Sequence, residues 1–299
     1  MERDIFIISV YCLVVEIMQI IEKNCKFRKR GFPPKLTDAE VITIEICGEF
    51  FKLHEDTEIY NYFKRHYLPF FPNLPERTTF VRQSANLWQV KRLCQSLIVR
   101  KAAQHLDQVQ SIDTLPLPVC TYTRGGFRDK RFPLVAEFGH CAAKKMDYYG
   151  FKLGLRITRL GMITHFPLLS ARTHDIHHLG SLIEGFCGTV PADKGFLDQY
   201  QQQLWNDVQQ TQIVAPHRQN MESSLEEVKL VKKTKYWRKL VETVGSQLVE
   251  RFQISKNKVK DLWHYQNRIF RKIMSHTVAV FLNMQLGNKP LQLALLNDF

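Results

Sequence analysis

Three acidic residues in this chain have the type and setting needed to hold divalent cations: Asp113, Asp193 and Glu242. Asp113 is the last residue of the segment 109–113, and Asp193 is the last residue of the segment 188–193. Each aspartate is expected to lie at the end of a strand. Phosphodiester transfer needs an activated nucleophile and a stabilised leaving oxygen, and two metal ions roughly 3.5–4 Å apart provide both. Mg²⁺ prefers hard oxygen ligands. Three carboxylates are therefore enough for this chemistry if the fold brings them together.

Glu242 is expected on a helix, where its neighbours define the face that it occupies. Helical spacing puts Arg238, Gly245, Ser246 and Val249 on the same side. The adjacent apolar stripe consists of Trp237, Val241, Val244, Leu248 and Phe252. Glu242 is therefore expected at the edge of the buried face. Gly245 costs about 1 kcal/mol of helix propensity, but it leaves open space beside the carboxylate.

A basic segment lies directly upstream, because residues 228–241 contain no acidic residue. Its basic members are Lys229, Lys232, Lys233, Lys235, Arg238 and Lys239. These residues, with Lys194 next to Asp193, can bind DNA phosphates. Each feature alone has a plainer explanation: an Asp at a strand end is usually a turn or cap residue, and a lysine run is often only a charged surface. The combination of all three carboxylates favours the metal site.

The elements that must position these residues begin near residue 106. Residues 151–158 alternate apolar and polar side chains, which predicts a half-buried strand. Gly161 marks a turn, and residues 162–169 complete a hairpin. Helices are predicted at 175–186, 197–209 and 240–252, and short strands at 189–192 and 212–215. This pattern predicts a mixed α/β sheet, with both aspartates at strand ends, where such sheets place ligand sites.

The flanking regions are predicted to be helical. Helices are expected at 5–21, 37–51, 57–66, 80–104 and 259–286. Basic positions in the first hundred residues suit a DNA-binding domain of helix-turn-helix type, and a packing domain with a solvated basic face fits equally well. The expected core stripe of the last helix is Leu262, Tyr265, Ile269, Ile273, Val278 and Phe281. Three domains follow: 1–105 for DNA binding, 106–257 for catalysis, and 258–299 as C-terminal helices.

Composition limits the classes of partner. The net charge is +13 and the pI is about 9.4, which favours a polyanion such as nucleic acid, although a merely soluble basic protein is the alternative. Seven cysteines without a Cys-x-x-Cys pair argue against a disulfide framework or a zinc ribbon and favour a reducing cytoplasm. The apolar stretch Ile5–Val15 is too short to span a bilayer, so no membrane partner is expected.

A second candidate site is the histidine cluster at 173–178. His174 and His178 have a spacing that can bind zinc. No glutamate follows His174, and no cysteine pair adds ligands. We therefore favour Thr173 or Asp175 as a helix cap, with the histidines near the surface.

Short stretches along nearly the whole chain have a familiar order and spacing. They are Leu36–Ile44, Ser111–Asp113, Pro116–Cys120, Tyr149–Leu153, Asp193–Phe196, Val241–Val244 and Ser246–Leu248. In these stretches the chain resembles bacterial insertion-sequence transposases with an Asp-Asp-Glu triad. The resemblance is greatest to the insertion-sequence family numbered 982.

This resemblance implies an RNase H-like catalytic domain, in which a mixed sheet is flanked by helices. It implies an enzyme that uses two Mg²⁺ ions, with Mn²⁺ as a substitute. The enzyme would cleave double-stranded DNA at terminal inverted repeats and join the ends to target DNA. Asp113, Asp193 and Glu242 would be the metal ligands, and Arg238 matches a basic position of the family. The resemblance also implies a bacterial cytoplasmic, nucleoid-associated protein that can act as a homodimer.

Three positions depart from the family pattern. Val249 stands where a lysine is common, and Gly245 where an aromatic residue is usual. Pro191 lies in a strand expected to be central, where its missing N–H weakens pairing. Two alternatives to an active transposase stay open. One is a nuclease of the same fold, and the other is a decayed transposase that only binds DNA.

Overall fold

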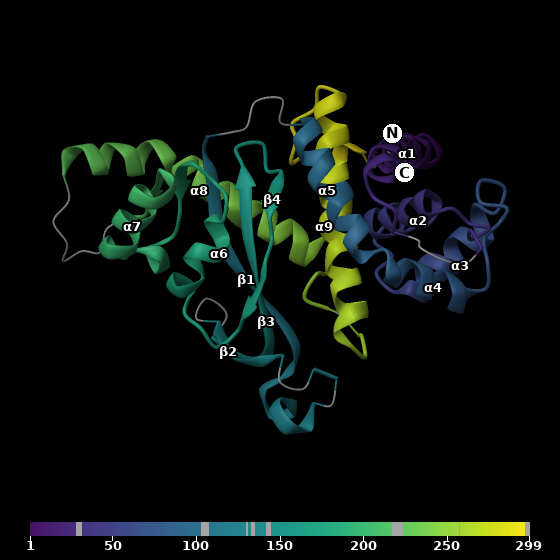
Figure 1. Ribbon diagram of the computed structural model, residues 1–299, viewed down its shortest axis with the longest axis horizontal. Helices are drawn as coiled ribbons and strands as arrows, with labels where there is room; N and C mark the ends of the chain where they lie inside the picture. Colours follow the sequence, from purple (N-terminus) through teal and green to yellow (C-terminus); the bar gives the residue numbers. More distant parts are fainter. Residues whose placement is uncertain are drawn as a thin grey trace. The chain divides into compact units, whose positions relative to one another are not determined.

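The chain divides into two units, which the computed structural model describes over residues 1–27, 32–102, 108–129, 131–132, 135–141, 145–216, 224–256 and 258–296. One unit contains residues 1–104 together with 248–299, and the other contains residues 105–247 (Figure 1). The C-terminal residues thus belong to the same unit as the first hundred residues. The functional roles assigned to 1–105, 106–257 and 258–299 stay predictions.

The described part of the first unit is helical. Its α-helices are α1 (Arg3–Asn24), α2 (Asp38–Phe50), α3 (Asp56–His66), α4 (Arg77–Asn86), α5 (Trp88–Ala102) and α9 (Leu262–Gln285). α2 starts where the sequence predicts, because Thr37 and Glu40 form a capping box. The prediction of one helix over 80–104 is wrong. The N–H of Leu87 bonds back to the carbonyl of Ser84 at 3.0 Å and ends α4, and α5 begins with the next residue.

α1 is long and apolar enough, by length and composition, to cross a membrane. The stretch judged too short, Ile5–Val15, is only part of this helix, which continues to Asn24. The core helix of a soluble protein passes the same test, and 44% of the apolar window is buried inside the structure. Its buried residues include Phe6, Val10 and Val14.

α9 carries the predicted apolar stripe and a buried charged side as well. All the predicted core residues are buried except Leu262, which is half-buried. Arg271 and Lys272 are also fully buried, and both contact Glu49 of α2, at 2.6 and 2.7 Å. Arg271 also pairs with Asp56. No sequence pattern predicts this network, because an amphipathic pattern places Lys and Arg in solvent.

The second unit is built on an antiparallel sheet with a parallel pair beside it. Its strands are β1 (Gln110–Thr121), β2 (Glu137–Cys141), β3 (Met146–Thr158), β4 (Ile163–His165), β5 (Leu168–Ser170), β6 (Gly188–Pro191) and β7 (Thr211–Val214). β3 is central and pairs antiparallel with β1, β2, β4 and β5. β6 and β7 are parallel, and a parallel bridge between Val109 and Thr189 sets β6 beside the start of β1. The predicted α/β class with mixed strand directions is confirmed.

The predicted hairpin is present, but its second strand is divided. Residues 162–169 form the two strands β4 and β5, because Pro167 has no N–H to donate. The Pro167 carbonyl instead accepts the N–H of Gly154 in β3, at 2.9 Å. A Cβ added to Gly154 would lie 2.5 Å from the Leu182 side chain, so glycine here allows the next helix to approach the strand.

Three helices complete this unit: α6 (Leu179–Ile183), α7 (Gln199–Gln209) and α8 (Leu225–Glu250). The helix expected over 175–186 is a 3₁₀ turn followed by the short α6, and Gly185 (φ +65°) turns the chain after it. The helix expected from residue 240 begins at Leu225, where Ser224 and Glu227 cap each other. The helix expected from residue 197 begins at Gln199, and Asp198 caps it.

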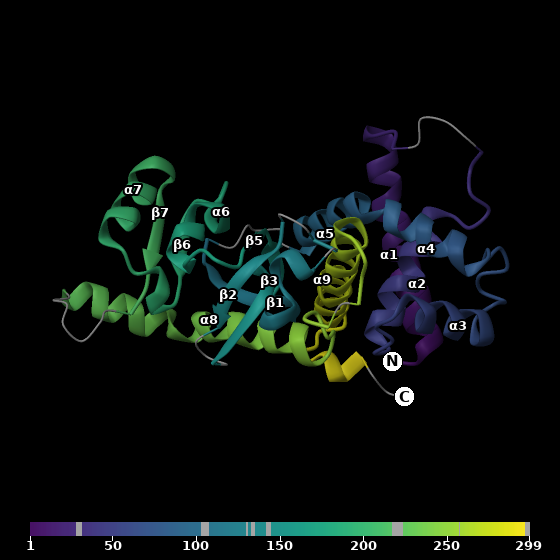
Figure 2. The ribbon, with the colours of Figure 1, turned by 90° about the horizontal axis from the view of Figure 1, so that it is seen from below.

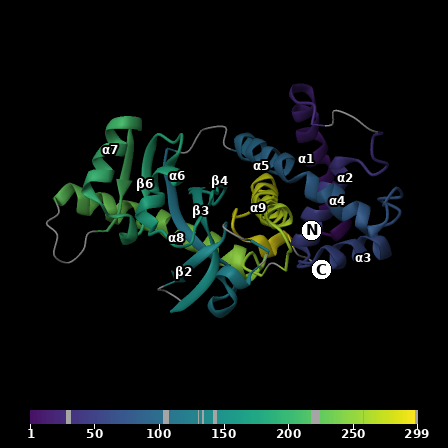
Figure 3. The same cartoon turned by 60° about the horizontal axis from the view of Figure 1, so that its bottom comes forward.

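The sheet is covered on both sides. Figure 2 shows α8 along one side of the sheet and α6 on the other. In Figures 2 and 3, β6 lies between α7 and the antiparallel sheet. The core on the α6 side includes Ile112, Leu179, Leu182, Val190, Phe196 and Ile213. Asp113, the next residue after Ile112, therefore points away from this core and toward the side of α8.

Candidate active site

Asp113 lies within β1, opposite Leu155 of β3. The prediction placed it at the end of a strand, but β1 continues to Thr121. Its carboxylate oxygen Oδ1 accepts the N–H of Thr114 at 2.7 Å. The side chain is half-buried. A rigid, central strand thus fixes the position of this carboxylate.

Asp193 lies two residues after the end of β6, and strand register brings it level with Asp113. Val109 and Thr189 are bridged in parallel, and the Thr189 N–H donates to the Gln108 carbonyl at 2.8 Å. Asp113 and Asp193 each lie four residues beyond this bridge. β1 and β6 run in the same direction, so the two aspartates lie at the same distance beyond the bridge between these strands.

Pro191 is compatible with this arrangement, because its missing N–H lies on the far side from β7. The N–H groups of Gly188 and Ala192 donate to β7 or its flank, at 3.1 and 2.9 Å. The N–H of Thr189 points the other way, toward the start of β1. Pro191 is two residues after Thr189, so its backbone nitrogen faces the same way, toward β1. Its missing N–H therefore removes no hydrogen bond between β6 and β7. Pro191 instead prevents one bond toward β1, just before Asp193.

Arg238 links the other two carboxylates. Its Nη1 lies 3.2 Å from Asp193 Oδ1 and 3.1 Å from Glu242 Oε1 on the next turn of α8. The side chains of Asp193 and Glu242 are 58% and 53% exposed, whereas that of Arg238 is 24% exposed. One arginine therefore holds both acids at the open edge of the unit.

The electrostatics show that the neighbouring acids act on Asp113. Burial, together with the negative charges of Asp175, Asp193 and Glu242, raises the pKa of Asp113 to about 7, against the opposing effect of the hydrogen bond from Thr114. A cation placed among them would be strongly favoured. Among the described residues, however, no three His, Cys, Asp or Glu side chains are close enough to hold a metal ion as they stand.

A known family matches this part of the chain. The family described as "Transposase DDE domain" matches residues 103–262, more than half of the chain, including all three carboxylates. The chain belongs to this family. It is a transposase, an enzyme of DNA transposition and recombination. A search of the curated proteins and a search of the solved structures found no match. The narrower assignment to the insertion-sequence family numbered 982 stays a prediction.

The prediction that Thr173 or Asp175 caps a helix is wrong, because His174 takes the cap position. The structure instead places Asp175 near the transposase's candidate triad. Its Oδ1 lies 2.9 Å from Lys152 Nζ, which also donates to the Thr173 carbonyl at 2.8 Å. Asp175 begins a 3₁₀ turn, and the residue before it is the cap. Its charge contributes to the raised pKa of Asp113. Asp113 and Asp175 are far apart in sequence, so only the folded structure shows that they lie near each other.

The histidine cluster at 173–178 has a structural explanation. His178 is buried, and its Nε2 lies 3.1 Å from the Ser170 carbonyl. His174 is the residue before the 3₁₀ turn, and it is exposed. The two histidines thus have different surroundings, and no zinc role is assigned to them.

The predicted DNA-binding lysines are solvent-exposed on the transposase. Lys232, Lys233, Lys235 and Lys239 lie on α8, and Lys194 follows Asp193; all are exposed. The space predicted at Gly245 is present, since an added Cβ there would meet nothing within 4 Å. The lysines are thus free to meet a DNA backbone along α8, and Gly245 leaves open space one turn after Glu242.

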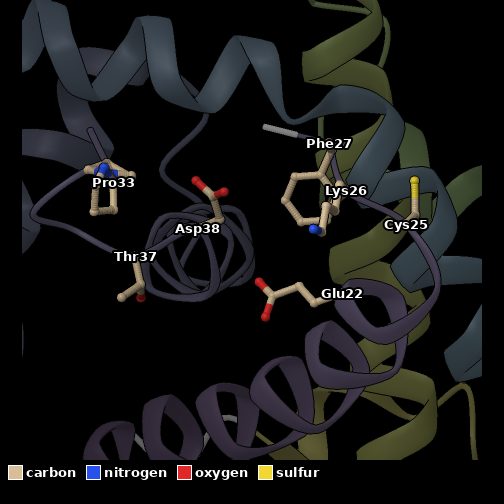
Figure 4. A pocket seen from close by; sticks show the side chains of 8 residues that line it. Glu22, Cys25, Lys26, Phe27, Pro33, Thr37 and Asp38 are labelled. Atoms are coloured by element: carbon tan, nitrogen blue, oxygen red, sulfur yellow. The ribbon is translucent and has the colours of Figure 1, made fainter. Parts of the chain in front are cut away.

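A separate hollow of about 320 Å³ lies in the first unit, between the end of α1 and the start of α2. Its lining residues are Glu22, Cys25, Lys26, Phe27, Pro33, Pro34, Thr37 and Asp38 (Figure 4). Figure 4 shows the Glu22 carboxylate directed toward α2, which begins at Asp38. Residues 28–31 continue from Phe27 and lie outside the described part. We therefore assign this hollow no function.

Proposed function

We propose that this transposase cleaves DNA at terminal inverted repeats and joins the ends to target DNA by metal-dependent phosphodiester transfer. The observation that carries the proposal is the contact of Arg238 with both Asp193 and Glu242, beside the half-buried Asp113. An RNase H-like arrangement fits the central β1 and the neighbouring parallel strands. Insertion-sequence family 982 is the narrower membership that we propose.

The donor chemistry fits Mg²⁺, with Mn²⁺ as a substitute. Asp113, Asp193 and Glu242 offer hard carboxylate oxygens, which Mg²⁺ prefers. The raised pKa of Asp113, caused by burial and by the neighbouring acids, shows an accumulation of negative charge that a cation would relieve. Two bound ions would favour deprotonation of the attacking water or 3′ hydroxyl and stabilise the leaving oxygen.

The residues of the chain have distinct tasks in this proposal. Arg238 keeps Asp193 and Glu242 apart from solvent cations until DNA and metal enter, and it can then bind a phosphate. The exposed lysines of α8, with Lys194, hold the DNA backbone. Asp113 must lose its proton before it can serve as a ligand.

The helical unit supplies a surface suited to DNA recognition. The first turns of α4 expose Arg77, Thr78, Thr79 and Arg82. Tyr60 of α3 packs against Phe80 of α4, and Lys64 lies over the Tyr60 ring at 5.7 Å. A helix with exposed Arg and Thr can read base edges, and the nearby lysine can bind a phosphate. Binding to terminal repeats as a homodimer is part of the same proposal.

Alanine substitution tests the triad. Asp113→Ala, Asp193→Ala and Glu242→Ala should each abolish Mg²⁺-dependent cleavage of terminal-repeat DNA and leave binding largely intact. Asp207→Ala is the matched control, because Asp207 is an exposed acid on α7. If each triad variant still cuts, the assignment is wrong. Cutting without strand joining would indicate a nuclease, and a gel shift without any product would indicate a decayed transposase.

A further inference from the structure

A proline-rich turn joins α3 to α4 in the helical unit and consists of residues 67–76 (Figure 1). The side chains of Leu68 and Phe70 at its start are 44% and 41% exposed. Pro69, between them, is exposed as well. We call Leu68, Pro69 and Phe70 the apolar tip. Removing such side chains from water is favourable, so the tip suits an apolar surface of a partner.

The turn holds the apolar tip in a defined conformation. The N–H of Phe70 donates to the Tyr67 carbonyl at 3.0 Å, and the N–H of Phe71 donates to the Leu68 carbonyl at 3.1 Å. Phe71 is buried, and its ring meets the Phe63 ring edge-on, with the ring centroids 5.7 Å apart. The prolines of the turn fix their own φ angles. The tip is therefore preorganised, and little conformational entropy is lost when it binds.

Positive charge borders the apolar tip on the side of α3. Lys64, Arg65 and His66 are the last residues of α3, and all three are exposed. Residues 59–75 contain no acidic residue. The tip is too small for a stable protein interface, which takes about 20–30 residues on each side. DNA complements both features, because its phosphates attract the cations and its base steps accept apolar side chains.

The length of α3 separates the apolar tip from the exposed face of α4. Arg77 Nη1, in the first turn of α4, donates to the Thr57 hydroxyl in the first turn of α3 at 3.1 Å. The tip follows the opposite end of α3. This helix has 11 residues, so it is about 16 Å long. Half a turn of B-DNA, which separates a major groove from the next minor groove, is roughly 17 Å. With α4 in a major groove, the tip can reach the neighbouring minor groove.

We propose that the apolar tip enters the minor groove of the terminal repeat, where Leu68 and Phe70 wedge open a base step and bend the duplex. The inference rests on the proposed function, because it takes the exposed face of α4 as the surface that reads the repeat. Proteins that bind the minor groove frequently insert Phe, Leu or Pro between base steps and kink the duplex by about 20–90°. Lys64 and Arg65 bind the phosphates beside this groove.

Energy transfer between dyes at the two ends of a terminal-repeat duplex measures the bend. The repeat is read from the DNA around the gene, and EDTA prevents cleavage. Binding of the protein should bend the duplex by about 20–90°. Phe70→Ala should lower this angle to less than about half, whereas Phe70→Met should keep most of it, because Met also serves as a wedge. A bound duplex that stays straight, or an equal bend with Phe70→Ala, overturns the proposal.

Two leucine variants separate the wedge from a general loss of apolar surface. Leu68→Ala should lower the bend angle, because Leu68 belongs to the apolar tip. Leu93→Ala is the matched control, since Leu93 is an exposed leucine on α5 of the same unit. It should bend the duplex as the wild type does. Urea unfolding checks that both variants are folded. Equal behaviour of the two leucine variants overturns the proposal.

Base analogues identify the groove that the tip enters. Inosine in place of guanine removes every amino group from the minor groove, and 2,6-diaminopurine in place of adenine puts one at every base pair. Neither analogue changes the hydrogen-bonding groups of the major groove, which α4 would read. The inosine duplex should bend as far as the natural repeat, and the diaminopurine duplex less than about half as far. Equal bends of the two duplexes overturn the placement in the minor groove.

Lipid binding is the competing explanation for an apolar tip that cations border. Co-sedimentation with vesicles of phosphatidylcholine and phosphatidylserine tests it. Vesicle binding that Phe70→Ala abolishes, with an unchanged DNA bend, overturns the proposal. The bend is measured without cutting, so the two proposals fail separately. A wild-type protein that cuts terminal repeats but leaves them straight overturns this inference alone. One that bends them but never cuts in Mg²⁺ overturns only the proposed cleavage.

Discussion

Arg238 Nη1 lies 3.2 Å from Asp193 Oδ1, although Arg238 is on α8 and Asp193 lies in the segment just after β6. The same nitrogen lies 3.1 Å from Glu242 Oε1. The arginine therefore occupies the electrostatic place that a metal ion would take between these acids. Metal binding and the Arg238 ion pairs must compete.

Replacing this arginine should strengthen metal binding. Each exposed ion pair contributes only about 0.2–1 kcal/mol, so losing two should lower the Mn²⁺ concentration for half-saturation roughly 2- to 30-fold in Arg238→Met. Paramagnetic resonance of free Mn²⁺ measures this directly. Arg172→Met is the control, because Arg172 is an exposed arginine after β5 in the same unit. Unchanged or weaker Mn²⁺ binding in Arg238→Met would refute the competition.

Asp113 should make the metal-free protein less stable as pH rises. Burial and the neighbouring acids raise the pKa of Asp113 to about 7 in the folded state, above its ordinary value of 3.8. The folded state therefore binds the proton more tightly, and this group lowers stability progressively between about pH 4 and 7. Asp113→Asn removes the effect. It should match the wild type near pH 4 and exceed it by about 1–3 kcal/mol at pH 8.

Urea unfolding in EDTA across this pH range measures the difference. Asp207→Asn is the control, since Asp207 is an exposed acid in the same unit and its replacement should give a profile parallel to the wild type. Parallel profiles for Asp113→Asn and the wild type would show that Asp113 is not shifted.

Much of the candidate site could be predicted because its signals are local. Asp193 directly follows the short strand predicted at 189–192, and the helical spacing of Arg238 and Glu242 alone predicts their contact. The strand that pairs with β1, which is β3, is visible in the sequence as a period of two. These features depend on residues that are near in sequence, so pattern and propensity are enough to find them.

The other features of the site and the fold depend on contacts between residues that are far apart in sequence, and no local pattern predicts these contacts. Asp175 lies near Asp113 only because the chain turns back after β3, which pairs with β1 and carries Lys152, the ion-pair partner of Asp175. Strand register decides which neighbouring strand the nitrogen of Pro191 faces. It therefore decides whether this proline removes a hydrogen bond from the sheet. The burial of Lys272 against Glu49 joins residues 223 positions apart.

The lysines of α8 should contribute to DNA binding through charge alone. Lys233→Ala and Lys239→Ala should each reduce the slope of log affinity against log salt concentration by about 0.9, as expected for one lost phosphate contact. Fluorescence anisotropy with duplex DNA at several salt concentrations measures the slope. Lys289→Ala, in an exposed segment after α9, is the control. Unchanged slopes would show that the lysine run is only a solvated surface.

The buried ion network of the helical unit should be far more sensitive to substitution than an exposed ion pair. Burial opposes ionisation of Glu49, but the charges of Lys272 and Arg271 outweigh it and hold the pKa of this carboxyl below its ordinary value. Its contribution to stability is therefore present at neutral pH and is lost as the pH falls below about 4. Glu49→Gln leaves two buried cations poorly compensated and should cost about 3–5 kcal/mol of unfolding free energy at pH 7.

Glu16→Gln is the matched comparison, because it breaks the exposed pair with Lys101 in the same unit. This change should cost less than about 1 kcal/mol. Both variants are compared with the wild type by urea unfolding at pH 7 and at pH 3. The large deficit of Glu49→Gln at pH 7 should shrink at pH 3, because the carboxyl of the unfolded wild type binds a proton more readily than that of the folded wild type and the wild type loses stability. Similar small losses for both variants would show that the network adds no more than a surface ion pair.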